Sequence, residues 1–228
     1  MPKKVKVSII IPSFNEFYSL DGLLGRIGKV KIPYQKEIII VNDGSTDQTA
    51  SYLRKLKNHK IITNPRNLGK GASIRKALKH VTGDIVIIQD ADFEYDPKDY
   101  NNLLSPFRNK DVQVVYGSRE LVKNPVSHWT FNLGGRLVTK ITNLLYKTHI
   151  TDEPTGYKLF RAKLIKAIKL ESRGFEFCPE VTAKIAKRKV KIIEVPISYN
   201  PRPISEKKIK WWDGFVAIYF LLKYKFTD

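Results

Sequence analysis

The sequence contains a single cysteine, Cys178, and no long apolar run. One cysteine excludes an intramolecular disulfide and a zinc site built on clustered cysteines, and we read Cys178 as a small buried residue. The longest uninterrupted apolar stretch, residues 215–222, has eight residues, whereas a helix needs about 20 to span a bilayer. We therefore expect no membrane span, and we read the basic start of the chain as leading into a first strand rather than as a signal peptide.

Acidic residues are also scarce, with 22 Asp and Glu against 41 Lys and Arg, which gives a net charge of +19. A purely solvated surface is usually closer to balance, so the excess indicates an anionic partner. No helix-turn-helix, zinc-finger or RNP pattern is present. We therefore rank a nucleic-acid-binding module as the weakest interpretation. The four histidines are scattered, and no side chains are spaced for nucleophilic catalysis.

The regular feature of the chain is an alternation of β-branched runs with helix-like segments. The runs fall at residues 7–12, 37–43, 60–64, 84–92 and 112–118. Continuous apolar strands separated by helices are typical of a parallel sheet covered on both faces. At 228 residues, the chain is long enough for one such domain. We predict an α/β, Rossmann-like fold with a mostly parallel central sheet and helices on both faces.

Polar clusters follow these runs, and in such a sheet they meet at the carboxyl edge, where ligands bind. The most acidic cluster is "QDADFEYDP", with Asp90, Asp92 and Glu94 at every second position. If the segment stays extended, these three side chains lie on one face and repel one another unless a cation sits between them. An all-oxygen site suits Mg²⁺ or Mn²⁺. Asp96 before Pro97 is instead read as a helix start.

The motifs taken together resemble the family 2 GT-A glycosyltransferases, and within them the polyprenyl-phosphate sugar transferases typified by dolichol-phosphate mannose synthase. The matching stretches cover nearly the whole chain: "VSIIIPSFNE", "VNDGSTD", "NLGKGASIRKAL", "QDADFEYDP", "GSR", "TDEPTGYKLFR", "GFEFCPEVTAKIAKR", "EVPISYNPR" and "KIKWWDG". The resemblance implies a GT-A fold and an inverting transfer of a hexose. Two positions depart from the family pattern: Asn42 stands where Asp is more usual, and Glu94 where mannose-type relatives often have Gln.

The resemblance also implies roles for individual residues. The donor, a nucleotide sugar of the GDP-mannose or UDP-glucose type, is expected to contact Pro12, Phe14, Glu16, Val41, Asp43, Asp90, Ala91 and Asp92. The Mg²⁺ or Mn²⁺ ion is expected at Asp90, Asp92 and Glu94. The acceptor phosphate is expected at Arg119, Arg136, Arg202 and Lys208, with Asp92, Arg119 and Arg202 as the catalytic residues.

The expected acceptor is a dolichyl or undecaprenyl phosphate. A phosphate monoester is already anionic at neutral pH, so it needs cationic residues to position it and no general base. The rival interpretation is a saccharide hydroxyl acceptor, which requires a base. Asp152 or Glu153 of "TDEPTG" would then supply it.

We divide the single domain, 1–228, into a nucleotide-sugar-binding half (1–119), an acceptor-side half (120–205) and an amphipathic C-terminal segment (206–228). Residues 207–226 combine five lysines with seven aromatic residues, a composition typical of a helix lying on an anionic membrane surface. Residues 128–147 show a similar pattern, and core packing is the alternative for both. We expect a peripheral protein at the cytoplasmic face of the membrane, where a membrane-embedded partner protein is also conceivable.

Overall fold

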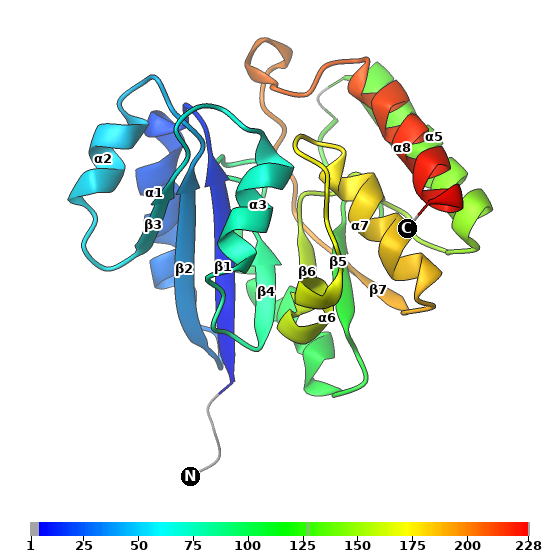
Figure 1. Ribbon diagram of the computed structural model, residues 1–228, viewed down its shortest axis with the longest axis horizontal. Coiled ribbons are helices and arrows are strands. Elements are labelled where there is room, and N and C mark those ends of the chain that lie inside the picture. Colours follow the sequence, from blue (N-terminus) through cyan, green and yellow to red (C-terminus); the bar gives the residue numbers. More distant parts are fainter. Residues whose placement is uncertain (1–4, 127, 228) are drawn as a thin grey trace.

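A computed structural model describes residues 5–126 and 128–227. Its strands form one seven-stranded sheet in the order β3-β2-β1-β4-β6-β5-β7 (Figure 1). They are β1 (Lys6–Ser13), β2 (Gln35–Asn42), β3 (Lys60–Thr63), β4 (Ile85–Ile88), β5 (Val114–Ser118), β6 (Lys158–Arg161) and β7 (Ile192–Pro196). Strand β6 is antiparallel to both of its neighbours, and the other pairs are parallel. This confirms the predicted mostly parallel sheet.

Helices cover both faces of the sheet, as predicted. The α-helices are α1 (Phe17–Lys29), α2 (Thr49–Lys55), α3 (Lys70–Leu78), α4 (Tyr100–Leu104), α5 (Trp129–Tyr146), α6 (Ala162–Ala167), α7 (Phe177–Lys187) and α8 (Asp213–Phe226), with short 3₁₀ turns η1 (Pro97–Asp99), η2 (Ser105–Arg108) and η3 (Ile204–Glu206). Side chains alternate along β1, so that Ile9 and Ile11 pack with α1, α2 and α4, whereas Ile10 packs with α3, α6 and α7.

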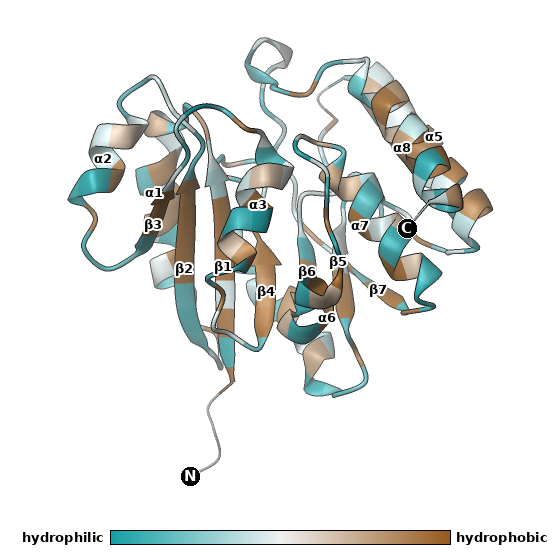
Figure 2. Ribbon diagram, viewed as in Figure 1, coloured by the Kyte–Doolittle hydropathy of each residue, from teal (hydrophilic) through white to brown (hydrophobic). Residues whose placement is uncertain are grey.

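Helices α5 and α8 lie together outside α7, at the β7 side of the sheet (Figure 1). Only a narrow face of each is buried: Val138, Thr139 and Thr142 on α5, and Leu221 and Tyr224 on α8. Apolar residues therefore remain on their outer surfaces, visible as brown bands in Figure 2. Among the described residues, no helix combines the length and the apolar character that crossing a membrane requires.

The acidic segment after β4 does not continue as an extended strand, so that part of the sequence prediction is wrong. Strand β4 ends at Ile88, and the chain then turns around the buried Gln89. The Gln89 amide donates to the carbonyls of Asp90 and Tyr95 at 3.0 and 3.3 Å. Its oxygen accepts from the hydroxyls of Tyr100 and Tyr157 at 2.8 and 2.7 Å. These four bonds fix the shape of the loop, because a buried amide left unpaired would be costly.

Gly156, in the segment just before β6, packs directly against this loop. The Gly156 N–H donates to the Tyr95 hydroxyl at 2.8 Å. A Cβ at position 156 would lie 2.7 Å from Cε2 of Tyr95 and would also collide with the Asp90 carboxylate. Only glycine therefore lets the two segments meet without a shift of Asp90.

Replacing this glycine tests that packing. We expect Gly156→Ala to lower the free energy of unfolding by about 1 to 3 kcal/mol, because the collision involves ring and carboxylate atoms held by other bonds. Urea unfolding measures the change. Gly25→Ala on α1, where an added Cβ meets nothing within 4 Å, is the control and should stabilise slightly. If Gly156→Ala were as stable as wild type, that result would contradict the tight packing of Gly156 against Tyr95 and Asp90.

Candidate active site

Four carboxylates gather at the carboxyl edge of the sheet, beyond the ends of β1 and β4. Glu16 precedes α1, and Asp90, Asp92 and Glu94 belong to the loop after β4. The side chains of Asp92 and Glu16 are only 8% and 10% exposed. Within the loop, Oδ1 of Asp92 accepts from the Glu94 N–H at 2.9 Å. The sequence prediction that acidic residues meet at this edge is therefore realised in the fold.

Each of these carboxylates has a cationic partner from elsewhere in the chain. Asp90 pairs with Lys70, the first residue of α3. Asp92 pairs with Arg202, which also contacts Glu16 at 3.1 Å. These contacts neutralise negative charge that burial would otherwise make unfavourable.

The loop between β7 and α8 supplies two further cations. Glu16 accepts from Lys208 at 2.7 Å, and Glu94 lies 3.4 Å from Lys207.

The three residues expected to hold Mg²⁺ or Mn²⁺ do not form a ready-made cage. Within residues 5–126 and 128–227, no group of three or more His, Cys, Asp or Glu side chains is placed to hold a metal ion. Glu94 is occupied by the Tyr199 hydroxyl at 3.1 Å and by the Arg202 N–H at 2.9 Å, because the loop bends after Asp92 instead of staying extended. Asp90 and Asp92 are paired with Lys70 and Arg202, so an ion would have to replace those cations before the two carboxylates could serve as ligands beside water and diphosphate.

The pKa of Asp92 reflects its burial first and the neighbouring charges second. Burial raises it from 3.8 to about 7, with Asp90 adding to the rise and Arg202 opposing it. A carboxylate of this kind gains from any additional positive charge. The donor set therefore fits a divalent cation in chemistry and charge.

The other residues expected to contact the donor lie around this cluster. Pro12 and Phe14 are half-buried at and just beyond the end of β1, whereas Val41 is completely buried in the core. Ala91 is buried, and its carbonyl accepts from the Ser19 hydroxyl at 2.9 Å. The Asp43 carboxylate accepts from Asn64, Leu68 and Gly69 at 2.7 to 3.0 Å. Asp43 thus fixes the loop before α3, and its contact with a nucleoside stays a prediction.

A cavity of about 460 Å³ lies beside the acidic cluster. Its charged and polar lining is Arg119, Glu120, Lys123, Asn124, His128, Asn132, Arg136, Thr139, Thr151, Asp152, Tyr199 and Lys207, and its apolar lining includes Leu121, Val122, Val126 and Phe131. Tyr199 and Lys207 also contact Glu94. These two residues therefore form a wall shared by the cavity and the acidic cluster.

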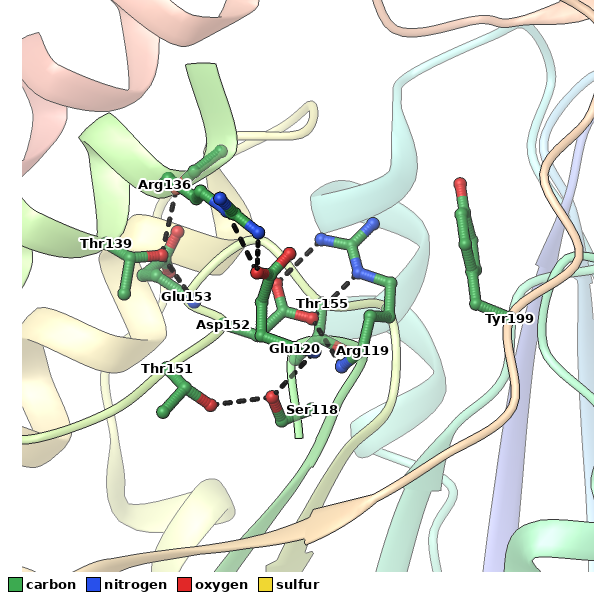
Figure 3. A network of polar contacts seen from close by, with 12 residues as sticks. Ser118, Arg119, Glu120, Arg136, Thr139, Thr151, Asp152, Glu153, Thr155 and Tyr199 are labelled. Atoms are coloured by element: carbon green, nitrogen blue, oxygen red, sulfur yellow. Dashed lines mark hydrogen bonds and ion pairs between the residues drawn. The ribbon is translucent and has the colours of Figure 1, made fainter. Parts of the chain in front are cut away.

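Arg119 is held rigidly at this cavity. Its guanidinium makes two bonds of 2.7 Å to Asp152, as Figure 3 shows. Its other side faces the ring of Tyr199, 5.1 Å from the ring centroid. Although burial alone would lower the pKa of Arg119, Tyr95 and Asp152 raise it well above its ordinary value. Arg119 therefore offers a fixed positive charge, of the kind that binds phosphate.

The four predicted acceptor contacts divide into two groups. Arg119 and Arg136 line the cavity, and Arg136 makes an exposed ion pair of 2.8 Å with Glu120 (Figure 3). Arg202 and Lys208 instead lie on the carboxylates expected to bind the donor. No local sequence pattern predicts these contacts, because the partners are more than 100 residues apart.

The two alternative bases are poorly placed for proton transfer. Burial would raise the pKa of Asp152, but Arg119 outweighs it and holds that pKa below the ordinary value. Glu153 is completely buried, and its Oε2 has no hydrogen-bond partner. Its pKa is raised by burial. Asp152 is thus held in its ion pair with Arg119, and Glu153 is buried out of reach of a substrate.

Lys70 is a site residue that sequence reasoning missed. Its side chain is 14% exposed and pairs with Asp90, which raises the pKa of Lys70 although burial opposes this. Gly69 before it has φ of 96°, and an added Cβ would collide with the backbone at Arg173. The stretch "NLGKG" could have pointed to a lysine aimed at the sheet edge, because such tight turns bring a helix start close to that edge.

The raised pKa of Asp92 predicts a pH-dependent stability. The folded protein keeps a proton on Asp92 that the unfolded chain loses near pH 4, so this group lowers stability as pH rises toward 7. We expect wild type to lose roughly 1 to 3 kcal/mol relative to Asp92→Asn between pH 5 and 8. Chemical unfolding with a chelator present measures it.

Asp111→Asn, which removes an exposed carboxylate, is the control for that experiment. It should follow the wild-type pH dependence. Identical pH dependence of wild type and Asp92→Asn would contradict the raised pKa.

Known proteins match this chain over most of its length. It is 27% identical over 232 residues to a dolichol-phosphate mannosyltransferase of Pyrococcus furiosus, covering 97% of this chain and 65% of that protein. It is 27% identical to a dodecaprenyl-phosphate galacturonate synthase of Rhizobium johnstonii, covering 98% and 69%. A dolichyl-phosphate beta-glucosyltransferase of Trichomonas vaginalis is 29% identical, with 90% and 69% covered. The chain thus spans about two thirds of these relatives' length.

Solved structures share the fold. Glucosyl-3-phosphoglycerate synthase from Mycobacterium tuberculosis, crystallised with Mn²⁺, UDP-glucose and phosphoglyceric acid, superposes with a TM-score of 0.76 at 18% identity, covering 97% of this chain and 80% of that one. This likeness establishes the GT-A fold. The family model described as glycosyl transferase family 2 matches residues 8–169. The chain therefore belongs to glycosyl transferase family 2.

Proposed function

We propose that this protein is an inverting glycosyltransferase that moves a hexose from a nucleotide sugar to a polyprenyl phosphate. The observation that carries the proposal is the contact between two dissimilar sites. A buried acidic cluster meets a cavity with arginines and apolar side chains, and Tyr199 and Lys207 belong to both. The first suits a metal-bound diphosphate, and the second suits a phosphate attached to a lipid.

On the donor side, Asp92 and Asp90 would hold Mg²⁺ or Mn²⁺. When bound, a divalent ion offsets the negative charge that develops on the departing diphosphate. Other residues of this chain hold Asp90 and Asp92 in position. Gln89, Tyr95 and Gly156 fix the loop that carries both carboxylates, which lowers the cost of ordering it on binding.

On the acceptor side, Arg119 and Arg136 would bind the phosphate. Arg119 is oriented by Asp152, which takes up two of its five N–H groups. The exposed pair of Arg136 with Glu120 is weak, so a phosphate dianion can replace that carboxylate. The apolar lining at Leu121, Val122 and Phe131 would contact the first carbons of the lipid.

In the reaction, a phosphate oxygen forms a bond to the anomeric carbon as the bond from that carbon to the diphosphate breaks. The diphosphate leaves with the electron pair, and attack from the opposite face inverts the carbon. A phosphate monoester has its second pKa near 6, so no proton has to be removed. The low pKa of Asp152 and the burial of Glu153 favour this acceptor over a saccharide hydroxyl.

The test is transfer of radiolabelled sugar from GDP-mannose and UDP-glucose to a polyprenyl phosphate, with Mn²⁺ or Mg²⁺ or excess chelator. We expect turnover that the chelator abolishes. Arg119→Ala should lower kcat/KM for the acceptor about 100-fold or more, because a fixed charge-assisted contact is lost, with donor affinity changed less than threefold. Arg108→Ala, which removes an arginine outside both sites, is the control.

Two results would contradict the proposal. One is full activity in excess chelator. The other is transfer to a soluble saccharide with a rate that rises through the pKa of a base while the polyprenyl phosphate is not used.

We further propose that the protein binds peripherally to the anionic cytoplasmic face of the membrane through α5 and α8. Exposed apolar residues recur at helical spacing on both helices: Trp129, Leu133, Leu137 and Leu144 on α5, and Phe215, Tyr219, Leu222 and Phe226 on α8. Lys140, Lys223 and Lys225 are exposed among them. Apolar stripes with flanking lysines are the composition of an interfacial surface.

Vesicle flotation tests this surface. We expect Phe215→Ala with Tyr219→Ala to weaken binding to vesicles containing phosphatidylserine at least about tenfold, since two large aromatic side chains on α8, 68% and 62% exposed, are lost. Tyr18→Ala, which removes an exposed aromatic on the distant α1, should bind as wild type does. Undiminished binding of the double variant would exclude this surface.

A further inference from the structure

A second cavity, of about 660 Å³, lies between α3 and the α6 region. Figure 1 shows α3 and α6 in front of the sheet, on the same face and away from α5 and α8. In the described part of the chain, this cavity shares no lining residue with the cavity beside Arg119, and none of the four clustered carboxylates lines it. It is therefore separate from both halves of the candidate active site.

The charges that line the second cavity are all positive. Lys76 donates to the Thr63 carbonyl and to the Asn64 side chain at 2.8 and 2.9 Å, and Lys166 donates to the Val81 carbonyl at 2.6 Å. These oxygen atoms belong to uncharged groups. Within residues 5–126 and 128–227, no carboxylate lines the cavity or pairs with its four cations, which are Arg75, Lys76, Lys79 and Lys166.

The end of α3 accounts for only a small part of this positive charge. Arg75 and Lys76 lie in its last turn, and Lys79 is its C-cap. The last turn of a helix carries roughly half a negative charge, whereas four cations gather at the cavity. Most of the positive charge at this place therefore has no counter-charge within the described chain, and an anionic ligand would provide one.

Arg75 keeps most of its hydrogen-bond donors unused. The side chain is half-buried, and its one hydrogen bond among the described residues is a long one, from Nη1 to the Leu170 carbonyl at 3.4 Å. Its Nε is buried without a hydrogen-bond partner. A guanidinium has five N–H donors in a fork that matches phosphate. Arg75 thus differs from Arg119, whose fork is held by Asp152.

The floor of the second cavity is aliphatic. No described lining residue is aromatic, so the cavity has no ring on which a nucleobase could stack. Hydrocarbon can instead contact the floor and the methylene stems of the lysines. The floor consists of Leu78, Ile165, Ile168 and Leu170.

The wall of the cavity next to the donor side is held in shape. Asn64, which is buried, accepts from Lys76 and donates to the Asp43 carboxylate at 2.7 Å. The N–H of Leu68, another lining residue, also donates to Asp43. A ligand in the cavity would therefore contact the segment that Asp43 fixes before α3.

We propose that the second cavity is an anion-binding site for a small molecule with a phosphate group and a short aliphatic body. Arg75 and Lys76 would bind the phosphate, and the exposed Lys79 and Lys166 would add positive charge at the rim. The volume falls in the range of small-molecule sites, which combine an apolar lining with a few polar groups. Binding here requires neither a nucleotide sugar nor a polyprenyl phosphate.

Octyl phosphate, added below its micelle concentration with a chelator present, tests the site. The methyl NMR signals of Ile165 and Ile168, assigned with Ile165→Val and Ile168→Val, report binding at this cavity alone because both residues line it. We expect both signals to shift as the cavity fills. Arg75→Gln with Lys76→Gln should weaken the binding that they report at least about tenfold, because charge-assisted hydrogen bonds are lost.

The matched control is Arg54→Gln with Lys55→Gln. It removes the same charge from the last turn of α2, where both side chains are exposed, and it should change the affinity by less than about twofold. A second variant, Lys79→Gln with Lys166→Gln, changes only exposed side chains. It should weaken binding at least about threefold, and it decides the question if the Arg75 variant does not fold.

Two further ligands separate the charge from the apolar body. Inorganic phosphate should bind at least about threefold more weakly than octyl phosphate, because it makes no contact with the aliphatic floor. Octanol should bind at least about tenfold more weakly, because it carries no charge.

Three results would overturn the proposal. The first is that the Ile165 and Ile168 signals stay unmoved while octyl phosphate binds elsewhere or not at all. The second is an equal loss of affinity in the Arg54 and Lys55 control, which would show an effect of net charge only. The third is octanol binding as tightly as octyl phosphate. Each result leaves the sugar-transfer assay unaffected, so the proposed function is decided separately.

Discussion

The structure depends on the repulsion among carboxylates that the fold forces together at one edge of the sheet. Asp90 and Asp92 follow directly from β4, and Glu16 follows from β1, its neighbour in the sheet. Burial removes the water that would screen them, and the pKa of Asp92, raised to about 7 by burial and then by Asp90, shows the cost. Positive charge must reach this edge, and the chain supplies it from α3 and from the loop between β7 and α8.

The need to balance these negative charges also explains why the acidic cluster and the cavity beside Arg119 are separate parts of the site. Lys70 and Arg202 contact the carboxylates directly, whereas Arg119 is held away from them by its bonds to Asp152. The cavity beside Arg119 therefore keeps a positive charge available for an anion, while the acidic cluster keeps a place for a cation. A reaction between a metal-bound diphosphate and a phosphate nucleophile requires this separation, because two anions approach each other only if each has its own counter-charge.

The features that were predictable from sequence are those set by local pattern. The β-branched runs fixed the strands, and their polar ends located the acidic edge at Asp90 and Asp92, because strand direction follows from the alternation with helices. The bend after Ile88 was not predictable, since it depends on Gln89 meeting Tyr100 and on Tyr157 arriving from a distant segment.

The pairing of Arg202 with Asp92 joins residues 110 positions apart, and no local pattern reports such a contact. Lys70 is intermediate between the features set by local pattern and the contacts between distant residues. It stands in the family motif "NLGKGASIRKAL", but its partner is Asp90 in another loop, and only the folded structure brings the two together.

The loop between β7 and α8 connects this edge of the sheet to the outer surface of the molecule. Its cations contact Glu16, Asp92 and Glu94. It continues through Trp211 and Trp212 into α8, whose outer stripe of Phe215, Tyr219 and Phe226 is exposed. A force that holds the two tryptophans at a lipid interface therefore acts on the same segment that covers Asp92. If a lipid surface favours one position of this loop, it shifts the equilibrium of the contact between Arg202 and Asp92 by the difference in binding energy between the two positions and by no more. In the proposed function, membrane contact and donor binding therefore act on one covalent segment.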